Sequence, residues 1–257
     1  KSVGKDFPVF LHPKTGEEYA LARRERKVGK GYRGFKFDSA STVTLVEDLA
    51  RRDLTVNAIA EDSDGKLIDP FGGIADLKAG KLRHVSSAFV EDPVRVLRVA
   101  RFAARFSRKG FQVTSETESL IEKMVKNKEI DSLVPERIWL EFVSALSERH
   151  PSIFFKVLHR TGALASVLPE IESLFKASHL HPMGYHEQNV GECALLAVDA
   201  SASATSDTRV RFAALVHDLE KGLQAHNPND RDHELPGATQ VRSLCSRLRV
   251  PTRFREL

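Results

Sequence analysis

The hydrophobic pattern of the chain changes near residue 90. In the first part, apolar and polar residues alternate in short runs, which predicts strands over 7–11 and 18–22 joined by a turn at 12–16. From residue 91 onward, apolar residues recur every three or four positions, as they do in amphipathic helices. The expected helices cover residues 91–107, 115–126, 135–149, 151–160, 191–204, 208–220 and 236–248.

Capping and turn residues complete the prediction for the first part. Thr44 is expected to cap a helix that begins near Leu45, because a threonine hydroxyl accepts a hydrogen bond from the first helical turn. A strand pair is expected over 54–60 and 66–69, on either side of the turn 62–65. Strands followed by a run of helices predict an α+β fold.

The composition is that of a globular protein. An apolar content of 41% is enough to bury a core, and no run of about eighteen apolar residues marks a membrane span. Residues 1–30 lack the charged-then-apolar layout of a signal peptide, so the cytoplasm is the expected compartment. Cys193 and Cys245 are far apart in the sequence and form no CxxC arrangement, so they predict neither a disulfide framework nor a zinc site.

The net charge is only +4, but the positive residues gather in two stretches. Such clusters suit a phosphate-rich partner, and a solvated surface explains a charge run at least as well. Charge by itself therefore does not decide the function. The clustered residues are Arg23, Arg24, Arg26, Lys27 and Lys30, followed by Arg95, Arg98, Arg101, Arg105 and Arg108.

The expected helix over 91–107 carries four arginines, Arg95 to Arg105, within about a third of its circumference. Apolar residues on the opposite side supply a buried face, so the arginine stripe is either solvated or paired with an anion. A triphosphate or a nucleobase edge is the more specific partner, because guanidinium groups form paired hydrogen bonds with phosphate and base acceptors.

A second motif is Arg51-Arg52-Asp53 followed by Asn57. The two arginines offer cations for phosphate, and the carboxylate and amide offer polar groups for a ribose hydroxyl. A surface ion pair between Arg52 and Asp53 explains the same residues equally well.

Three strings in this order, EDLARRDLTVNAIA, GKLIDPFGGIADLKAGKLRHVS and FVEDPVRVLRVARFAARF, carry a family resemblance. They resemble the bacterial CCA-adding tRNA nucleotidyltransferases of the poly(A) polymerase-like class, from residue 3 to about 174. The resemblance implies a small mixed-sheet nucleotidyltransferase head over 1–84, N-terminally incomplete. It also implies an all-helical neck over 85–175 with the nucleotide-selecting helix, and a helical body over 176–257.

The resemblance also implies roles for single residues. In the head, Glu18 falls on a catalytic carboxylate, and residues 69–77 fall on a flexible loop that changes the pocket between nucleotides. In the neck, Asp92 and Arg95 fall on the pair whose edges imitate a template base and select CTP or ATP. The remaining nucleotide-binding positions are Arg52, Asp53 and Asn57, at the sugar and triphosphate, and Arg98 and Arg101, at the incoming nucleotide.

The sequence departs from the family pattern at its start. The family begins with a strand, a Gly-Gly-x-x-Arg-Asp turn and an Asp-x-Asp pair that binds two magnesium ions, and none of these precedes Lys1. Mg²⁺ is the implied cofactor, because the metal ions orient the 3′ hydroxyl and neutralise the triphosphate. Asp62 and Asp64 have the required spacing but lie in a turn. The chain as written is therefore expected not to catalyse nucleotide addition.

A degenerate HD-like region is expected in the body. The string RFAALVHDLEKG resembles the signature of metal-dependent HD phosphohydrolases, in which His217 and Asp218 would be metal ligands. Cys193 stands where the upstream histidine belongs, and Glu220 stands where glycine is usual. The further candidate ligands are His181, His186 and His233. A structural His-Asp pair is the alternative, and it is the one we expect.

The leading interpretation is an enzyme of tRNA 3′-end CCA addition and repair, with tRNA, CTP and ATP as partners and no membrane. A bacterial poly(A) polymerase shares these motifs but usually lacks the lead-in LRHVSSAF of residues 82–89. A non-catalytic RNA-binding relative is a third interpretation, from a different class. The sequence does not indicate an oligomeric state.

Overall fold

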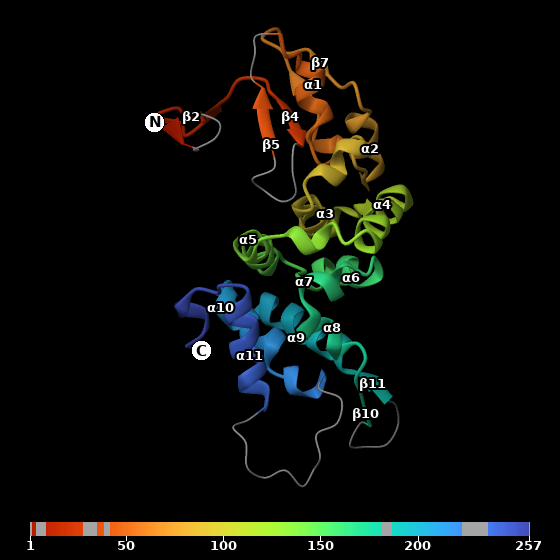
Figure 1. The fold of residues 1–257 in the computed structure, drawn as a ribbon, viewed down its shortest axis with the longest axis vertical. Helices are drawn as coiled ribbons and strands as arrows, with labels where there is room; N and C mark the ends of the chain where they lie inside the picture. The colour runs from red at the N-terminus through yellow and green to blue at the C-terminus, as the bar shows by residue number, and fades with distance from the viewer. Residues whose placement is uncertain are drawn as a thin grey trace. The chain divides into compact units, whose positions relative to one another are not determined.

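The computed structural model describes residues 2–3, 9–27, 35–38, 42–180, 187–222 and 236–256 (Figure 1). The chain folds into two compact units: the first comprises 1–79 and 83–92, and the second comprises 80–82 and 93–257. The first contains short strands and helices and the second is dominated by helices, which confirms the α+β prediction. In the described ranges no helix is long and apolar enough to cross a membrane.

Short antiparallel pairs form the sheets of the first unit. β1 (Ser2–Val3), β2 (Val9–Leu11) and β3 (Glu18–Tyr19) make one sheet in that order. The N–H of His12 donates to the carbonyl of Glu17 at 2.8 Å and closes the predicted turn. A second pair, which the alternation pattern does not predict, joins β4 (Arg24–Lys27) to β5 (Phe35–Asp38).

The helix predicted after Thr44 is α1 (Leu45–Ala50). The Thr44 hydroxyl accepts a hydrogen bond from the N–H of Glu47 at 3.3 Å, and the Glu47 carboxylate accepts one from the N–H of Thr44 at 2.9 Å. Each side chain therefore satisfies a backbone donor at the start of the helix, as in a capping box. The predicted cap is confirmed.

The strand expected over 54–60 is largely wrong. Only β6 (Ala60–Glu61) is a strand there, and it pairs with β7 (Leu67–Ile68) around the predicted turn. Residues Thr55–Asn57 form a 3₁₀ turn, η2, instead. The side chain of Asp53 hydrogen-bonds the backbone at the start of this turn, and such local bonds compete with a strand ladder.

The segment expected as a flexible loop, 69–77, contains a turn that leads into a helix capped by Asp69. α2 spans Gly73–Ala79, and the Asp69 carboxylate accepts hydrogen bonds from the N–H groups of Gly73 at 2.7 Å and Ile74 at 2.9 Å. A Cβ atom at Gly73 would lie 2.1 Å from the carbonyl oxygen of Thr55. Only glycine therefore permits α2 to pack this closely on η2.

Helices make up most of the second unit. Short sections α7 (Ala163–Val167) and α8 (Pro169–Leu174) follow α6 and are not predicted, because so few residues do not display a helical period. β8 (Lys81–Leu82) pairs with β9 (Gln112–Val113), and β10 (Ser178–Leu180) pairs with β11 (Glu187–Asn189). The predicted helices are α3 (Val94–Phe106), α4 (Ser115–Lys126), α5 (Pro135–Leu146), α6 (Ser152–Arg160), α9 (Val190–Ala204), α10 (Thr208–Val216) and α11 (Pro236–Arg247).

Aromatic side chains from separate elements meet in the core of the second unit. Trp139 of α5 contacts Phe212 of α10 edge to face at 5.7 Å between ring centroids. It contacts Phe254 of the 3₁₀ turn η7 (Thr252–Phe254) in the same way at 4.9 Å. Such pairs contribute about 0.5–1.5 kcal/mol each beyond the burial of their area. The C-terminal residues are thereby anchored to the helices.

Arg211 of α10 binds the ends of two other helices. Its guanidinium is nearly buried and donates five hydrogen bonds to carbonyl oxygens, at 2.6–3.2 Å. The acceptors lie at the C-terminal ends of α5 and α9, where helix carbonyls lack partners within their own helix. Burial lowers the pKa of Arg211, and the carbonyl dipoles at these helix ends favour the positive charge. The accepting residues are Leu146, Glu148, Ala202 and Thr205.

Replacing Arg211 by methionine is expected to lower the free energy of unfolding of the second unit by about 3 kcal/mol or more, because buried carbonyls lose their donors. Urea unfolding followed by circular dichroism measures the change. Arg209→Met, two positions away on the same helix, is the control and should lower the free energy of unfolding much less, because its ion pair with Asp207 is exposed to solvent. Equal effects of the two substitutions would contradict the role given to Arg211.

Candidate functional site

Asp48 organises the turn that follows α1. Its carboxylate accepts hydrogen bonds from Arg51 Nη2 at 2.6 Å, from Arg52 Nη2 at 3.4 Å and from the backbone N–H of Arg23 at 3.2 Å. Arg51 also donates to the carbonyl oxygen of Arg23 at 3.1 Å. The described ion-pair partner of Arg52 is therefore Asp48, whereas the sequence gives Asp53 as the candidate partner.

The electrostatics at Asp48 favour its charged form. Burial by itself would raise the pKa of this carboxyl, but the hydrogen bond and charge of Arg51, the N–H of Arg23 and the charge of Arg52 outweigh burial and lower the pKa. The sequence motifs did not identify Asp48 as a residue of this site. It could have been found from its spacing, because an acidic residue three and four positions before two arginines is within reach of both on a helix.

Arg52, Asp53 and Asn57 come together, as the motif predicts. The Asp53 Oδ1 atom accepts hydrogen bonds from the N–H of Leu54 at 2.8 Å and from Asn57 Nδ2 at 3.0 Å. Arg52 Nη1 donates to the carbonyl oxygen of Asn57 at 3.1 Å. Asp53 is buried, whereas 45% of the Arg52 side chain is exposed. The turn thus presents a guanidinium to solvent beside a carboxylate and an amide already held in place.

A network of hydrogen bonds around the buried side chains of Thr55 and Asp76 supports this turn. Thr55 Oγ1 donates to Asp76 Oδ2 at 2.8 Å, and Arg83 Nε donates to the same oxygen at 3.1 Å. The N–H of Thr55 donates to the carbonyl of Arg83 at 2.9 Å. Asp76 is on α2, so this helix fixes the backbone from which Asn57 projects. These residues come from three separate segments, and only the folded chain brings them together.

The arginines of α3 do not form a uniform exposed stripe. Arg95 is 6% exposed, Arg98 is half-buried and Arg105 is exposed. The Arg101 side chain is 13% exposed and its Nε donates to Glu141 Oε2 at 2.6 Å. A solvated stripe therefore does not describe Arg95 or Arg101, and the Nε group of Arg101 is already bonded to a carboxylate of the same chain.

Glu141 of α5 fixes the position of Arg101. The side chain of Glu141 is 10% exposed, so the ion pair lies in a partly dehydrated environment where a charge-assisted hydrogen bond is strong. The Arg101 guanidinium also lies 4.7 Å from the centroid of the Phe102 ring. The sequence does carry a signal for Glu141: it is an acidic residue on the face of α5 that otherwise buries Ile138, Phe142 and Ala145.

The remaining carboxylates of the prediction are spread over the first unit. Glu18 is exposed on β3, opposite Leu11, and Asp92 is half-buried just before α3. Asp62 accepts hydrogen bonds from the N–H groups of Asp64 and Lys66, at 3.0 and 2.9 Å, so it stabilises its own turn. Within the described ranges no three His, Cys, Asp or Glu side chains are grouped as metal ligands would be.

His217 and Asp218 lie together at the end of α10. His217 Nε2 is 3.2 Å from Asp218 Oδ2, and His217 Nδ1 is 2.9 Å from the carbonyl oxygen of Ala214. Lys221 Nζ donates to Asp218 at 2.7 Å. Cys193 is half-buried on α9. Three candidate ligands, His181, His186 and His233, lie outside the described residues.

Comparison with known proteins finds a matching family model in each of the two units. Residues 7–83 match the family model described as the poly A polymerase head domain. Residues 110–175 match the model described as a probable RNA and SrmB-binding site of polymerase A. The whole chain is 56% identical to the multifunctional CCA protein of Nitrosococcus oceani and 53% identical to that of Nitrosomonas europaea. It spans 63% and 62% of the length of these relatives.

Solved structures share the fold. A structure described as a tRNA-processing enzyme aligns with a TM-score of 0.60 at 23% identity, covering 97% of this chain and 61% of that chain. A tRNA nucleotidyltransferase complexed with a primer tRNA and an incoming ATP analogue aligns with a TM-score of 0.58 at 21% identity. That alignment covers 96% of this chain and 66% of the other.

The lowered pKa of Asp48 predicts how the stability of the first unit depends on pH. Since the folded pKa is below the unfolded value of 3.8, the stabilisation is present above about pH 4 and is lost as pH falls through the folded pKa. Asp48→Asn should lower the free energy of unfolding by about 1–2 kcal/mol at neutral pH, and the difference should shrink in acid.

Thermal unfolding between about pH 7 and pH 2 measures this effect. Asp64→Asn, which removes the same charge from an exposed turn, is the control and should change little at either pH. A difference between wild type and Asp48→Asn that stays constant down to the lowest pH would contradict the electrostatic explanation.

For the HD-like region we expect no stoichiometric transition metal in the purified chain after dialysis with nickel or manganese and desalting. A divalent ion held by only two protein groups keeps most of its waters and exchanges readily. Mass spectrometry of the metal content provides the measurement. About one tightly held ion per chain that His217→Ala removes would disprove this prediction.

Proposed function

The chain belongs to the family of the bacterial multifunctional CCA proteins, and from this premise we propose that its function is CCA addition and repair at the 3′ end of tRNA. The reaction transfers CMP from CTP and AMP from ATP to the 3′ hydroxyl of tRNA. The observation that carries the proposal is the turn in which Arg52, Asp53 and Asn57 are already hydrogen-bonded into one cluster.

We assign this cluster to the sugar and triphosphate of the nucleotide. The exposed Arg52 guanidinium offers several N–H donors to phosphate oxygens. Asp53 and Asn57 offer an acceptor and an amide for the ribose hydroxyls. Because their mutual hydrogen bond exists before a nucleotide arrives, binding orders fewer side chains and costs less entropy.

We assign the selection of the base to Asp92 and Arg95, and contacts with the incoming nucleotide to Arg98 and Arg101. Arg95 is 6% exposed, so its rotamers are restricted, as a residue that reads a base edge requires. The Arg101 guanidinium keeps N–H groups besides the Nε donor used by Glu141. Its part in nucleotide binding therefore uses the remaining donors or the fixed positive charge.

A nucleotidyltransferase of this family uses divalent metal ions, and we take the ion to be Mg²⁺, which would orient the 3′ hydroxyl and neutralise the triphosphate. Glu18 is the carboxylate of this chain that we assign to that chemistry. It is exposed, and the described residues place no two further His, Cys, Asp or Glu side chains with it. Glu18 by itself does not make a metal site.

We divide the chain by role into a head over 1–84, a neck over 85–175 and a body over 176–257, of which the last two hold tRNA. The proposed binding partners are tRNA, CTP and ATP, and the proposed compartment is the cytoplasm. In the body we treat His217 and Asp218 as a structural pair, which the bond from Lys221 to Asp218 supports.

A bacterial poly(A) polymerase is the rival, because the matched family model is named for that enzyme. A protein that includes this chain together with the rest of a family member's length should be incubated with tRNA lacking its CCA end. Incorporation of C, C and A from CTP and ATP supports the proposal. A long tail from ATP alone would instead identify a poly(A) polymerase, and tRNA binding without incorporation would identify a non-catalytic relative.

In the same assay, Arg95→Ala should reduce the preference for CTP and ATP over UTP and GTP about tenfold or more, because a paired contact to a base edge is worth about 1–3 kcal/mol. Affinity for tRNA should change little, since template edges specify rather than anchor. Arg105→Ala, from the exposed end of the same helix, is the control. A uniform fall in tRNA affinity with unchanged nucleotide choice would show that Arg95 contacts phosphate.

A further inference from the structure

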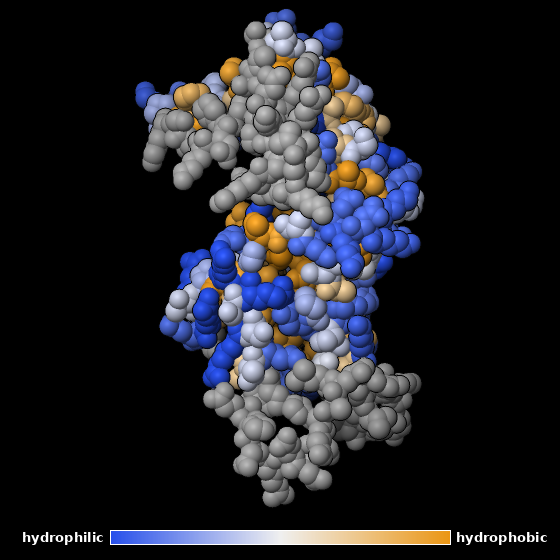
Figure 2. All heavy atoms as spheres, viewed as in Figure 1, coloured by the Kyte–Doolittle hydropathy of each residue, from blue (hydrophilic) through white to orange (hydrophobic). Residues whose placement is uncertain are grey.

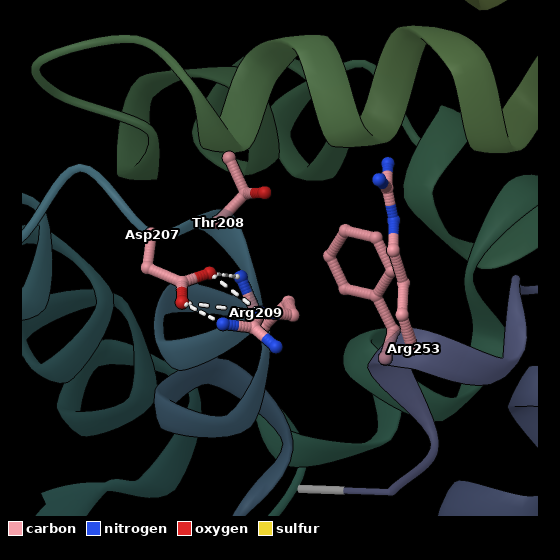
Figure 3. A pocket seen from close by; sticks show the side chains of 5 residues that line it. Asp207, Thr208, Arg209 and Arg253 are labelled. Carbon is pink, nitrogen blue, oxygen red and sulfur yellow. Dashed lines mark hydrogen bonds and ion pairs between the residues drawn. The ribbon is translucent and has the colours of Figure 1, made fainter.

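A small cavity opens in the second unit beside the start of α10, and none of the residues assigned to the nucleotide, the metal or the HD-like pair lines it. Its volume is about 280 Å³, and Figure 3 shows it as a slot with Thr208 and Arg209 on one side and Arg253 on the other. On the face drawn in Figure 2, hydrophilic side chains gather over α10 and the C-terminal residues. The lining residues are Asp207, Thr208, Arg209, Arg253 and Phe254.

Asp207 holds Arg209 in place on one side of the slot. Its carboxylate accepts hydrogen bonds from the N–H of Arg209 at 2.9 Å and from Arg209 Nη2 at 2.5 Å, and it caps α10. Hydrogen bonds from the Arg209 side chain and backbone, together with the charges of Arg209 and Arg253, lower the pKa of Asp207 to about 2, so the carboxylate is charged at neutral pH. Arg209 Nη1 makes no described bond to Asp207 and points away from it in Figure 3.

Arg253 differs from the other arginines near the C-terminus. Arg247 pairs with Glu170, Arg249 pairs with Glu136, and Arg255 donates to the carbonyl oxygen of Val250. In the described part of the chain, Arg253 makes no hydrogen bond or ion pair. Its guanidinium lies 5.4 Å from the centroid of the Phe254 ring.

The framework around the slot is rigid. Phe254 is buried against Trp139 and Phe212, which fixes the backbone next to Arg253. Arg211 fixes α10 through its bonds to the ends of α5 and α9. The side chains of Arg209 and Arg253 therefore line one cavity from separate segments, 207–209 and 252–254. Together with Asp207 they leave one net positive charge.

We propose that this cavity binds a phosphodiester group of an RNA backbone, through Arg253, the outer N–H groups of Arg209 and the Thr208 hydroxyl. This inference rests on the proposed function, since it names a tRNA contact in the body. Guanidinium groups pair with phosphate oxygens in a fork, and a hydroxyl donates to a third oxygen. The single net positive charge matches a diester, which carries one negative charge, better than the two charges of a phosphate monoester.

The size of the cavity favours the same ligand. Sites that enclose a whole small molecule occupy about 300–1,000 Å³, so a cavity at the lower edge of this range fits a phosphate with its sugars rather than a complete nucleotide triphosphate. The arginines and Thr208 offer donors that phosphate oxygens can accept, and the Asp207 carboxylate, the group that would accept from a base amine, already binds Arg209. We therefore expect a contact that anchors RNA of any sequence.

The test compares Arg253→Gln with Arg249→Gln in this chain. Both remove one positive charge near the C-terminus, and Arg249 does not line the cavity. Binding of fluorescent tRNA is measured by anisotropy over a range of KCl concentrations. Arg253→Gln should weaken binding several-fold and reduce the slope of log K against log salt concentration by about 1, because one phosphate contact is lost. Arg249→Gln should keep the wild-type slope.

The fold of each variant is checked by its thermal unfolding midpoint, which should change little, because Arg253 makes no hydrogen bond or ion pair within the described ranges and the Arg249–Glu136 pair is exposed to solvent. Equal slopes for the two variants, or an unchanged slope for Arg253→Gln, would overturn the site.

A second experiment titrates the chain with AMP and with inorganic phosphate. If Arg253→Gln abolishes binding of either compound while the affinity for tRNA is unchanged, the cavity is a site for a free phosphate instead. If the wild-type chain fails to bind tRNA, the cavity proposal fails, whereas the proposed function is decided separately by the incorporation assay on the longer protein.

Discussion

The helical unit depends on the buried charge of Arg211, whose hydrogen-bond acceptors within the described ranges are carbonyl oxygens rather than carboxylates. Arg211 lies where α5 and α9 end, and the carbonyl oxygens at these ends carry partial negative charge that their own helices leave unsatisfied. A guanidinium supplies five N–H donors in one plane, so one side chain can satisfy several carbonyls from two helices. Lysine, with a compact ammonium on a flexible stem, lacks this geometry. The position of α10, and of everything attached to it, follows from this arrangement.

At the sites assigned to ligands, arginines are likewise held by hydrogen bonds to acceptors of the chain, and there the acceptors are carboxylates. Asp48 holds Arg51 and Arg52, Glu141 holds Arg101, and Asp207 holds Arg209, in each case with N···O distances at or below 3.4 Å. An arginine left free in water would lose much of its rotamer entropy on binding phosphate. A carboxylate that bonds one edge of the guanidinium restricts the side chain in advance and leaves other N–H groups for an anion. We therefore expect these acidic partners to contribute to ligand binding without touching the ligand.

These partners explain why the candidate sites were only partly predictable. The arginines, Asp53 and Asn57 stand in short motifs, and the hydrogen bonds of Asp53 and Asn57 join residues four apart, within reach of local reasoning. Glu141 lies 40 residues from Arg101, and Asp76 lies 21 residues from Thr55. Periodicity gives the face on which each residue lies, but it does not say which face of another helix will be opposite. The expected uniform stripe on α3 failed for this reason.

The sequence by itself determined the helices of the second unit, the cap at Thr44, the hairpin turn at 12–16 and the order of the motifs, because these depend on side-chain period and on bonds between near neighbours. Tertiary structure decided which arginines are buried, which carboxylates hold them, and that Arg253 lines a cavity without a hydrogen bond or ion pair among the described residues. It also replaced a predicted strand by η2, since Asp53 satisfied the backbone locally and α2 packed against the turn through Gly73. Burial and ion pairing arise between segments distant in the chain, and a one-dimensional pattern holds no information on which of them meet.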